Sequence, residues 1–174
     1  MNDSPRPEID PHLFRRVMGA FPTGVTVIAA QDGEQIRGMT ANAFMSGSLE
    51  PPLCIVSIAR RAQMHDVMDS ARHFGVSILS ESQEAMSDHF AGRPNPDLRI
   101  EFDLSRAAPI LREACGHIVA ETVARHDCGD HTLFIGHILE LDANDRPPLL
   151  YHSGRYGALD RWRAERDVAV PEFW

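Results

Sequence analysis

Residues 38–48 combine small side chains with hydroxyl and amide groups at the expected end of a strand. Small side chains leave the main chain accessible, so a planar ligand with hydrogen-bonding atoms along its edge could approach it closely. Plain turn chemistry gives the same composition, because Asn, Ser and Thr side chains often bond to nearby backbone. The stretch is a candidate binding site, with a turn as the alternative.

Residues 57–64 form a second candidate, in which two adjacent arginines stand where an expected strand leads into a helix. The free amides of a helix N-terminus, together with the guanidinium groups of Arg60 and Arg61, would suit a phosphate group. The alternative is a pair of solvated arginines on a surface turn.

Two further stretches could border one pocket. Residues 129–136 place His131 at the start of an expected strand, and residues 151–156 form an expected loop that contains Gly154 between two tyrosines.

His126, Cys128 and His131 also have the spacing H-x-C-x-x-H, which raises the question of a metal site. These three residues straddle an expected tight turn, and no fourth ligand is close in sequence. We therefore expect no metal, with a small metal-binding module as the alternative.

The elements that must position these residues are mainly strands joined by turns. Three helices are expected, at residues 12–20, 65–71 and 82–90, the first capped by Asp10 and the last by Ser82. Strands are expected at residues 25–30, 36–44, 53–58, 74–79 and 149–152, with two long strands between Cys115 and Leu141. Strands linked by turns rather than by helices favour a mainly antiparallel barrel over a doubly wound sheet.

Length and charge limit the classes of protein that need to be considered. The 174 residues suit one domain, with a core at about residues 11–160 and flanking termini. Lys and Arg number 17 against 25 Asp and Glu, a net charge of −8, so neither nucleic acid nor an anionic membrane is an expected partner. Residues 1–7 do not resemble a secretion signal, and we expect a cytoplasmic protein with reduced cysteines at 54, 115 and 128. The sequence lacks the G-x-G-x-x-G motif of dinucleotide-binding domains, the G-x-x-x-x-G-K-[ST] motif of P-loop proteins and the G-x-S-x-G motif of hydrolases.

Several runs together resemble the short-chain flavin reductases, which are reductase components of two-component flavin-dependent monooxygenases. The runs are residues 21–27, 38–53, 90–92 and 129–136, within a match from about Leu13 to Tyr156. Residues 40–46 and 62–64 are particularly similar to the reductase component of phenol hydroxylase.

The resemblance implies a six-stranded antiparallel split barrel with a few short flanking helices. It also implies a homodimer that holds FMN or FAD in a groove next to the subunit interface and uses NADH or NADPH as co-substrate. Reduced flavin would pass to a partner monooxygenase. The implied flavin contacts are Thr40, Ala41, Asn42 and Ser46 at the ring, Ser57, Ile58, Ala62, Gln63 and Met64 toward the phosphate, and Phe90 and Ala91 on the far wall. The implied nicotinamide contacts are His131, which is also the candidate catalytic residue, and Ser153, Gly154, Arg155 and Tyr156.

Two positions depart from the family pattern. Ala62 stands where many relatives carry a hydroxyl, so phosphate contact there would depend on backbone amides or nearby arginines. Gly47 replaces a common valine and could loosen its loop. A non-catalytic flavin-binding or electron-carrier protein on the same barrel is the main alternative to a reductase.

Overall fold

The computed structural model describes residues 8–159, and its main feature is a seven-stranded antiparallel sheet. In spatial order the strands are β3 (Gln35–Ala41), β2 (Thr26–Asp32), β6 (His73–Ile78), β9 (Gly116–Cys128), β10 (His131–Ala143), β5 (Leu53–Ala59) and β4 (Phe44–Ser48). A smaller sheet contains β1 (Thr23–Gly24), β11 (Leu149–His152) and β12 (Arg155–Ala158), and a third contains β7 (Phe102–Asp103) and β8 (Ile110–Leu111). The helices are α1 (Pro11–Gly19), α2 (Gln63–Ser70), the 3-10 turn η1 (Glu81–Gln83) and α3 (Glu84–Phe90).

The main sheet curls because its two edge strands are neighbours in the sequence. β3 ends at Ala41 and β4 begins at Phe44, so three Cα steps, at most about 11 Å, join the two edges. The Ser57 amide donates to the Ala43 carbonyl at 3.0 Å, which fixes this crossing against β5. We call residues 40–46 together with Ser57 the seam.

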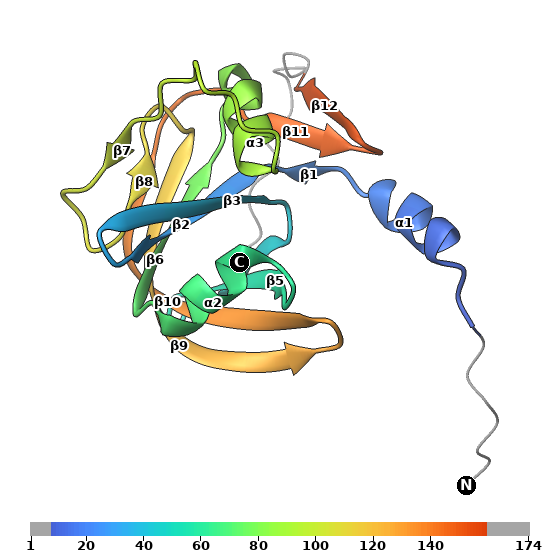
Figure 1. The fold of residues 1–174 in the computed structure, drawn as a ribbon, viewed down its shortest axis with the longest axis horizontal. Helices are drawn as coiled ribbons and strands as arrows, with labels where there is room; N and C mark the ends of the chain where they lie inside the picture. Colours follow the sequence, from blue (N-terminus) through green and yellow to red (C-terminus); the bar gives the residue numbers. More distant parts are fainter. Residues whose placement is uncertain (1–7, 160–174) are drawn as a thin grey trace, which may run out of the picture.

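The curled sheet surrounds a core that α2 covers on its open side (Figure 1). The fully buried side chains of this core include Ile28, Val56, Ile58, Phe74 and Phe134. Alternate residues of β5 explain the arrangement, since Cys54, Val56 and Ile58 point inward while the residues between them point outward. α2 packs on this core through Met64, Val67 and Met68.

A second, smaller core lies between the sheet and the elements that flank it. Val25, Val27, Leu79, Leu111 and Leu149 are its buried members. The partly buried side chains of Met86, Phe90, Ile100, Phe102, Tyr151 and Tyr156 pack against them. This second core holds α3 and the β11–β12 hairpin against the sheet.

The expected mainly antiparallel fold is confirmed, but three details of the sequence prediction were wrong. The strand expected at residues 36–44 breaks at Asn42 and Ala43 into β3 and β4, so the main sheet has seven strands rather than six. Periodicity missed this break because the residues on both sides alternate as strands. The cap of the third helical segment is Ser80 rather than Ser82, because Ser80 and Gln83 bond reciprocally in a capping box. The two-residue strands β1, β7 and β8 were also missed, as was β12, which lies partly where a loop was expected.

Helix α1 is capped by Asp10 as expected, yet none of its residues is buried. Leu13, Phe14, Val17 and Met18 are 44–60% exposed, and Phe21 beyond the helix is 73% exposed. Figure 1 shows α1 projecting away from the sheets. Between residues 8 and 159, no helix is long and apolar enough to cross a membrane.

Gly75, in the middle of β6, allows the segment before β8 to pack directly on the sheet. A Cβ atom at this position would lie 2.1 Å from the Pro109 carbonyl oxygen, a backbone atom that cannot rotate away. We predict that Gly75→Ala lowers the free energy of unfolding by roughly 3 kcal/mol, measured by denaturant titration. Gly24→Ala is the matched control, because its added Cβ would meet no heavy atom within 4 Å. Equal stability of the two variants would contradict this packing.

Candidate functional site

A groove of about 1020 Å³ brings three of the predicted flavin residues together. Gln63 and Met64 enter it from the start of α2, and Phe90 enters from the end of α3. The rest of its lining is Asp32, Ile36, Arg37, Gly38, Asp66, Val67, Ser70, His89, Gly92 and Pro94. The groove therefore runs between the β2–β3 hairpin and α2.

The N-terminus of α2 is open to an anion. Ala62 occupies the N-cap and has no side chain that could bond to the amides of the first turn. Arg61 next to it is exposed. The Ala62 and His65 amides already donate to the carbonyls of Ala59 and Ala62, both at 2.9 Å, which leaves the Gln63 and Met64 amides for the phosphate that the sequence analysis expects here.

Phe90 forms one wall of the groove because β3 has a glycine beneath it. A Cβ on Gly38 would lie 2.7 Å from the Phe90 ring, so a larger residue would displace the ring. Phe102 also packs against Phe90, with ring centroids 6.1 Å apart and the planes at 64°. Contacts with Gly38 and Phe102 therefore hold the Phe90 ring in place. Ala91, its predicted neighbour on the wall, is exposed.

Some polar groups of the seam are bonded within the protein and others are exposed. The Thr40 hydroxyl donates to the Ser87 carbonyl at 2.6 Å, and the Ala41 carbonyl accepts from the Thr26 hydroxyl at 2.7 Å. Asn42 and Ser46 are exposed, and Ser57 is half-buried. The Thr40 hydroxyl proton is therefore used within the protein, whereas the side chains of Asn42 and Ser46 are exposed and available to a ligand.

Three of the predicted flavin residues are core residues. Ile58 is fully buried, Met64 is 4% exposed and Ala41 is 9% exposed, and all three belong to the core inside the sheet. Their main-chain groups can face a ligand, but their side chains stabilise the fold.

His131 is oriented by its neighbour Asp130. The Asp130 carboxylate lies 2.7 Å from His131 Nδ1, and because a carboxylate only accepts, Nδ1 carries the proton and Nε2 is left for a ligand. Hydrogen bonding from His131 is the largest cause that lowers the pKa of Asp130, so this carboxyl is charged at neutral pH. This role of Asp130 was missed in the sequence, where no spacing rule marks it.

The turn that carries these two residues is tied to β5. The Arg60 amide donates to the Asp130 carbonyl at 3.0 Å, and the Arg60 guanidinium lies 2.7 Å from Asp127. His131 pairs with Ala59 in the ladder between β10 and β5. His131 consequently stands beside the chain that leads into α2.

The predicted nicotinamide residues form two groups rather than one. Ser153, Arg155 and Tyr156 line a separate pocket of about 530 Å³, next to the glycine turn at Gly154. Figure 1 shows the turn between β11 and β12 well apart from the turn between β9 and β10 that carries His131. The large groove contains neither group, and His131 does not line the pocket of Ser153, Arg155 and Tyr156.

A metal site is not formed by the described residues. Cys128 pairs with His131 across the hairpin, but no group of three or more His, Cys, Asp or Glu side chains between residues 8 and 159 is arranged to hold a metal ion. All three cysteines are unpaired thiols. Burial raises the pKa of Cys54 to about 11, which makes this thiol unreactive at neutral pH.

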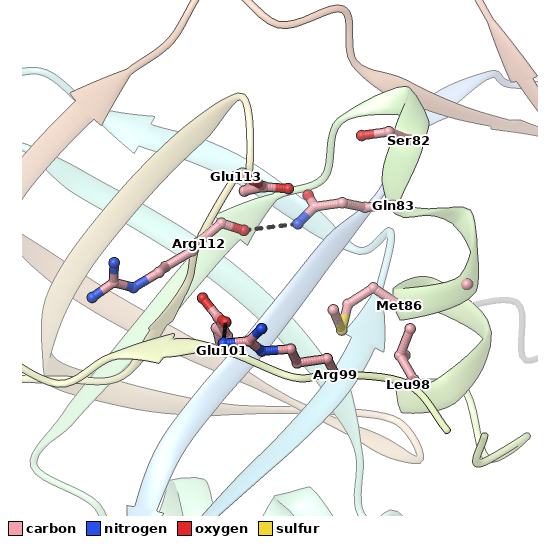
Figure 2. A pocket seen from close by; sticks show the side chains of 9 residues that line it. Ser82, Gln83, Met86, Leu98, Arg99, Glu101, Arg112 and Glu113 are labelled. Carbon is pink, nitrogen blue, oxygen red and sulfur yellow. Dashed lines mark hydrogen bonds and ion pairs between the residues drawn. The ribbon is translucent and has the colours of Figure 1, made fainter. Parts of the chain in front are cut away.

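Another cavity, of about 320 Å³, lies beside the first turn of α3 (Figure 2). Two of its polar pairs are formed within the protein: the Gln83 side chain donates to the Arg112 carbonyl at 2.8 Å, and Arg99 pairs with Glu101 at 2.6 Å. It contains none of the predicted site residues.

Comparison with known proteins identifies the family. The model of the flavin reductase like domain matches residues 18–160. The chain belongs to this family. The resemblance found in the sequence is thereby confirmed.

Individual members of the family align over most of their length. An NADH-dependent flavin reductase from Rhodococcus sp. is 40% identical over 157 residues, covering 88% of this chain and 89% of the relative. The reductase component of 4-hydroxyphenylacetate 3-monooxygenase from Thermus thermophilus is 40% identical over 147 residues, with 84% and 95% covered. The structure of the flavin reductase PheA2 superposes with a TM-score of 0.85 at 39% identity, covering 88% of this chain and all of that one.

The pairing of Asp130 with His131 predicts that losing the Asp130 charge slows the reaction with NADH. Asp130→Asn removes the charge that fixes the His131 tautomer, and we expect kcat/KM for NADH to fall about 5-fold while the flavin Kd stays unchanged. Asp127→Asn is the control, because it breaks an ion pair in the same turn without touching His131. Steady-state kinetics that show the same loss in both variants would argue against an orienting role for Asp130.

Proposed function

We propose that this chain is an NADH-dependent flavin reductase that reduces FMN or FAD and supplies the reduced flavin to a partner monooxygenase. The observation that carries the proposal is the match to the flavin reductase like domain over residues 18–160, which contain the groove, the seam and His131. The Rhodococcus relative is an NADH-dependent flavin reductase, and the Thermus relative is the reductase component of a monooxygenase. The chain is accordingly an oxidoreductase.

The described residues fit a flavin in three respects. Uncapped amides at the start of α2 suit its phosphate, and the Phe90 ring over Gly38 gives a flat apolar wall. The seam offers main-chain groups together with Asn42 and Ser46 for the polar edge of the ring. We propose that these residues hold the cofactor, with Thr40, Ala41, Ile58 and Met64 contributing through their backbones.

When bound, the flavin accepts a hydride from NADH, and this chemistry belongs to the two cofactors once they are aligned. The protein needs no acid-base triad. The protein's own residues bind the flavin and NADH and orient them. We propose that His131 uses Nε2 to orient the nicotinamide or to stabilise negative charge on the reduced flavin. We also propose that the Ser153–Tyr156 loop, which lies apart from His131, contacts the nicotinamide.

We also propose that the chain works as a homodimer. The outward residues of the sheet form the row Met45, Ile55 and Ile135, which are direct neighbours in the ladders of β4, β5 and β10. Met45 is 58% exposed, and Leu49, in the turn after β4, is 70% exposed. Exposed apolar surface of this kind, together with the apolar side of α1, is typical of a subunit interface.

Three further proposals concern the barrel, the domain organisation and the cellular location. We propose that the curled sheet is a split barrel open between β3 and β4, within a single domain. Three unpaired cysteines support a cytoplasmic location, where thiols stay reduced.

The activity is tested by NADH oxidation in the presence of added FMN or FAD. We predict oxidation that rises with flavin concentration, and a roughly 10- to 150-fold lower kcat/KM for NADH in His131→Ala, with little change in flavin Kd. Flavin binding without any NADH oxidation would identify a flavin carrier instead. If His131 merely caps its turn, the variant loses thermal stability while the folded protein keeps the wild-type rate.

The dimer is tested by light scattering at micromolar concentration. We predict the mass of two chains, and a shift toward the monomer for Ile55→Asp, which places a charge in the outward row. Ile36→Asp serves as the control, because Ile36 is a half-buried residue on the β2–β3 hairpin outside that row. A monomeric wild-type protein would rule out the proposed interface.

A further inference from the structure

A hydrogen-bonded chain joins the strand that leads into the seam to the loop that the proposed function places beside the nicotinamide. The Thr40 hydroxyl on β3 donates to the Ser87 carbonyl on α3. On the other side of α3, the Tyr156 hydroxyl lies 2.8 Å from Ser87 Oγ and 3.0 Å from Asp88 Oδ1. Asp88 is further paired with Arg93.

The direction of each bond in this chain follows from the groups involved. The Asp88 carboxylate only accepts, so the single proton of the Tyr156 hydroxyl goes to Asp88, and Ser87 Oγ donates to the Tyr156 oxygen. Desolvation, with a contribution from Asp88, raises the pKa of Tyr156, so the phenol stays protonated at neutral pH. Its proton is held by Asp88 and is not directed at a ligand.

Tyr156 is the main attachment of β12 to the rest of the protein. β12 is an edge strand that pairs with β11, and of its four residues Tyr156 alone is shielded from solvent. The turn before it uses positive φ angles at Ser153 (49°) and Gly154 (81°). Three other contacts hold this loop: its pairing with β11, the contact of Tyr156 with Tyr151, and the Ser153 amide and hydroxyl, which donate to the Gly19 carbonyl at 2.9 and 3.1 Å. The bond from Tyr156 is the one that ties the loop to α3.

We propose that Asp88 is a positioning residue for NADH: by accepting the Tyr156 hydroxyl, and with Arg93 holding its carboxylate, it fixes the Ser153–Tyr156 loop relative to β3. This inference rests on the proposed function, which assigns that loop to the nicotinamide side. Asp88 acts through Tyr156 and does not itself touch the reacting atoms. α3 thereby keeps the two sides of the site at a constant separation.

The test compares Asp88→Asn, Tyr156→Phe and the double variant in steady-state kinetics. We expect each single variant to raise KM for NADH about 5- to 10-fold, with kcat at saturating NADH and the flavin Kd within about 2-fold of wild type. Asp88→Asn removes the charge that strengthens this bond and the ion pair with Arg93, and Tyr156→Phe removes the bond itself. The double variant should therefore be no worse than Tyr156→Phe alone. Glu101→Gln is the control, since it breaks an exposed ion pair with Arg99 in the cavity of Figure 2 and should change none of these constants.

Results that contradict the role of Asp88 can be told apart from results that contradict the reductase function. An active wild-type enzyme whose KM for NADH is unchanged in Asp88→Asn, or whose single effects multiply in the double variant, overturns the role of Asp88. A fall in melting temperature with unchanged KM likewise shows a merely structural bond and overturns it. Should Asp88→Asn fail to fold, Tyr156→Phe alone decides by the same split between KM and kcat. A wild-type protein without NADH oxidation would instead refute the reductase function.

Discussion

The short connection between β3 and β4 is the constraint on which the rest of the structure depends. Asn42 and Ala43 carry the chain from one edge of the seven-stranded sheet to the other, so the sheet has to curl. Curling encloses the apolar core and creates the open side that α2 covers through Met64, Val67 and Met68. It also gathers at one seam the residues that the family resemblance assigns to the flavin ring. Fold and binding site therefore share one cause.

In the proposed function, polar side chains of the site hold neighbouring elements in place and are not needed for proton transfer. Asp130 fixes the tautomer of His131, and Ser87 and Asp88 fix Tyr156. Hydride transfer requires two cofactors to be held in contact, and the barrier depends steeply on their alignment. A protein with this task benefits from rigid supports more than from shifted acids and bases. The described residues of the site match that requirement.

Sequence reasoning recovered the features that depend on local patterns. The Asp10 cap, the hairpin turns at Gly33 and Gly129, and the long β9–β10 pair all follow from residue type and periodicity. Periodicity did not reveal the break at Asn42, because strand alternation continues on both sides of it. It also gave no sign that Tyr156 bonds to residues 68 and 69 positions earlier in the chain, since such contacts are set by the packing of distant elements. Of the residues that the family resemblance assigns to the flavin, Gln63, Met64 and Phe90 line one groove. His131 and the Ser153–Tyr156 segment, both assigned to the nicotinamide, lie in separate places (Figure 1).

The central claim is that hydride passes directly from NADH to flavin on this protein, and anaerobic single-turnover mixing tests it most directly. The protein, loaded with one flavin per chain, is mixed with a limiting amount of NADH in the absence of oxygen and of any partner oxygenase. The account predicts that the absorbance of oxidised flavin is lost in step with that of NADH, one flavin reduced for each NADH consumed. Flavin that stays bound and oxidised while NADH is left unconsumed would contradict the account.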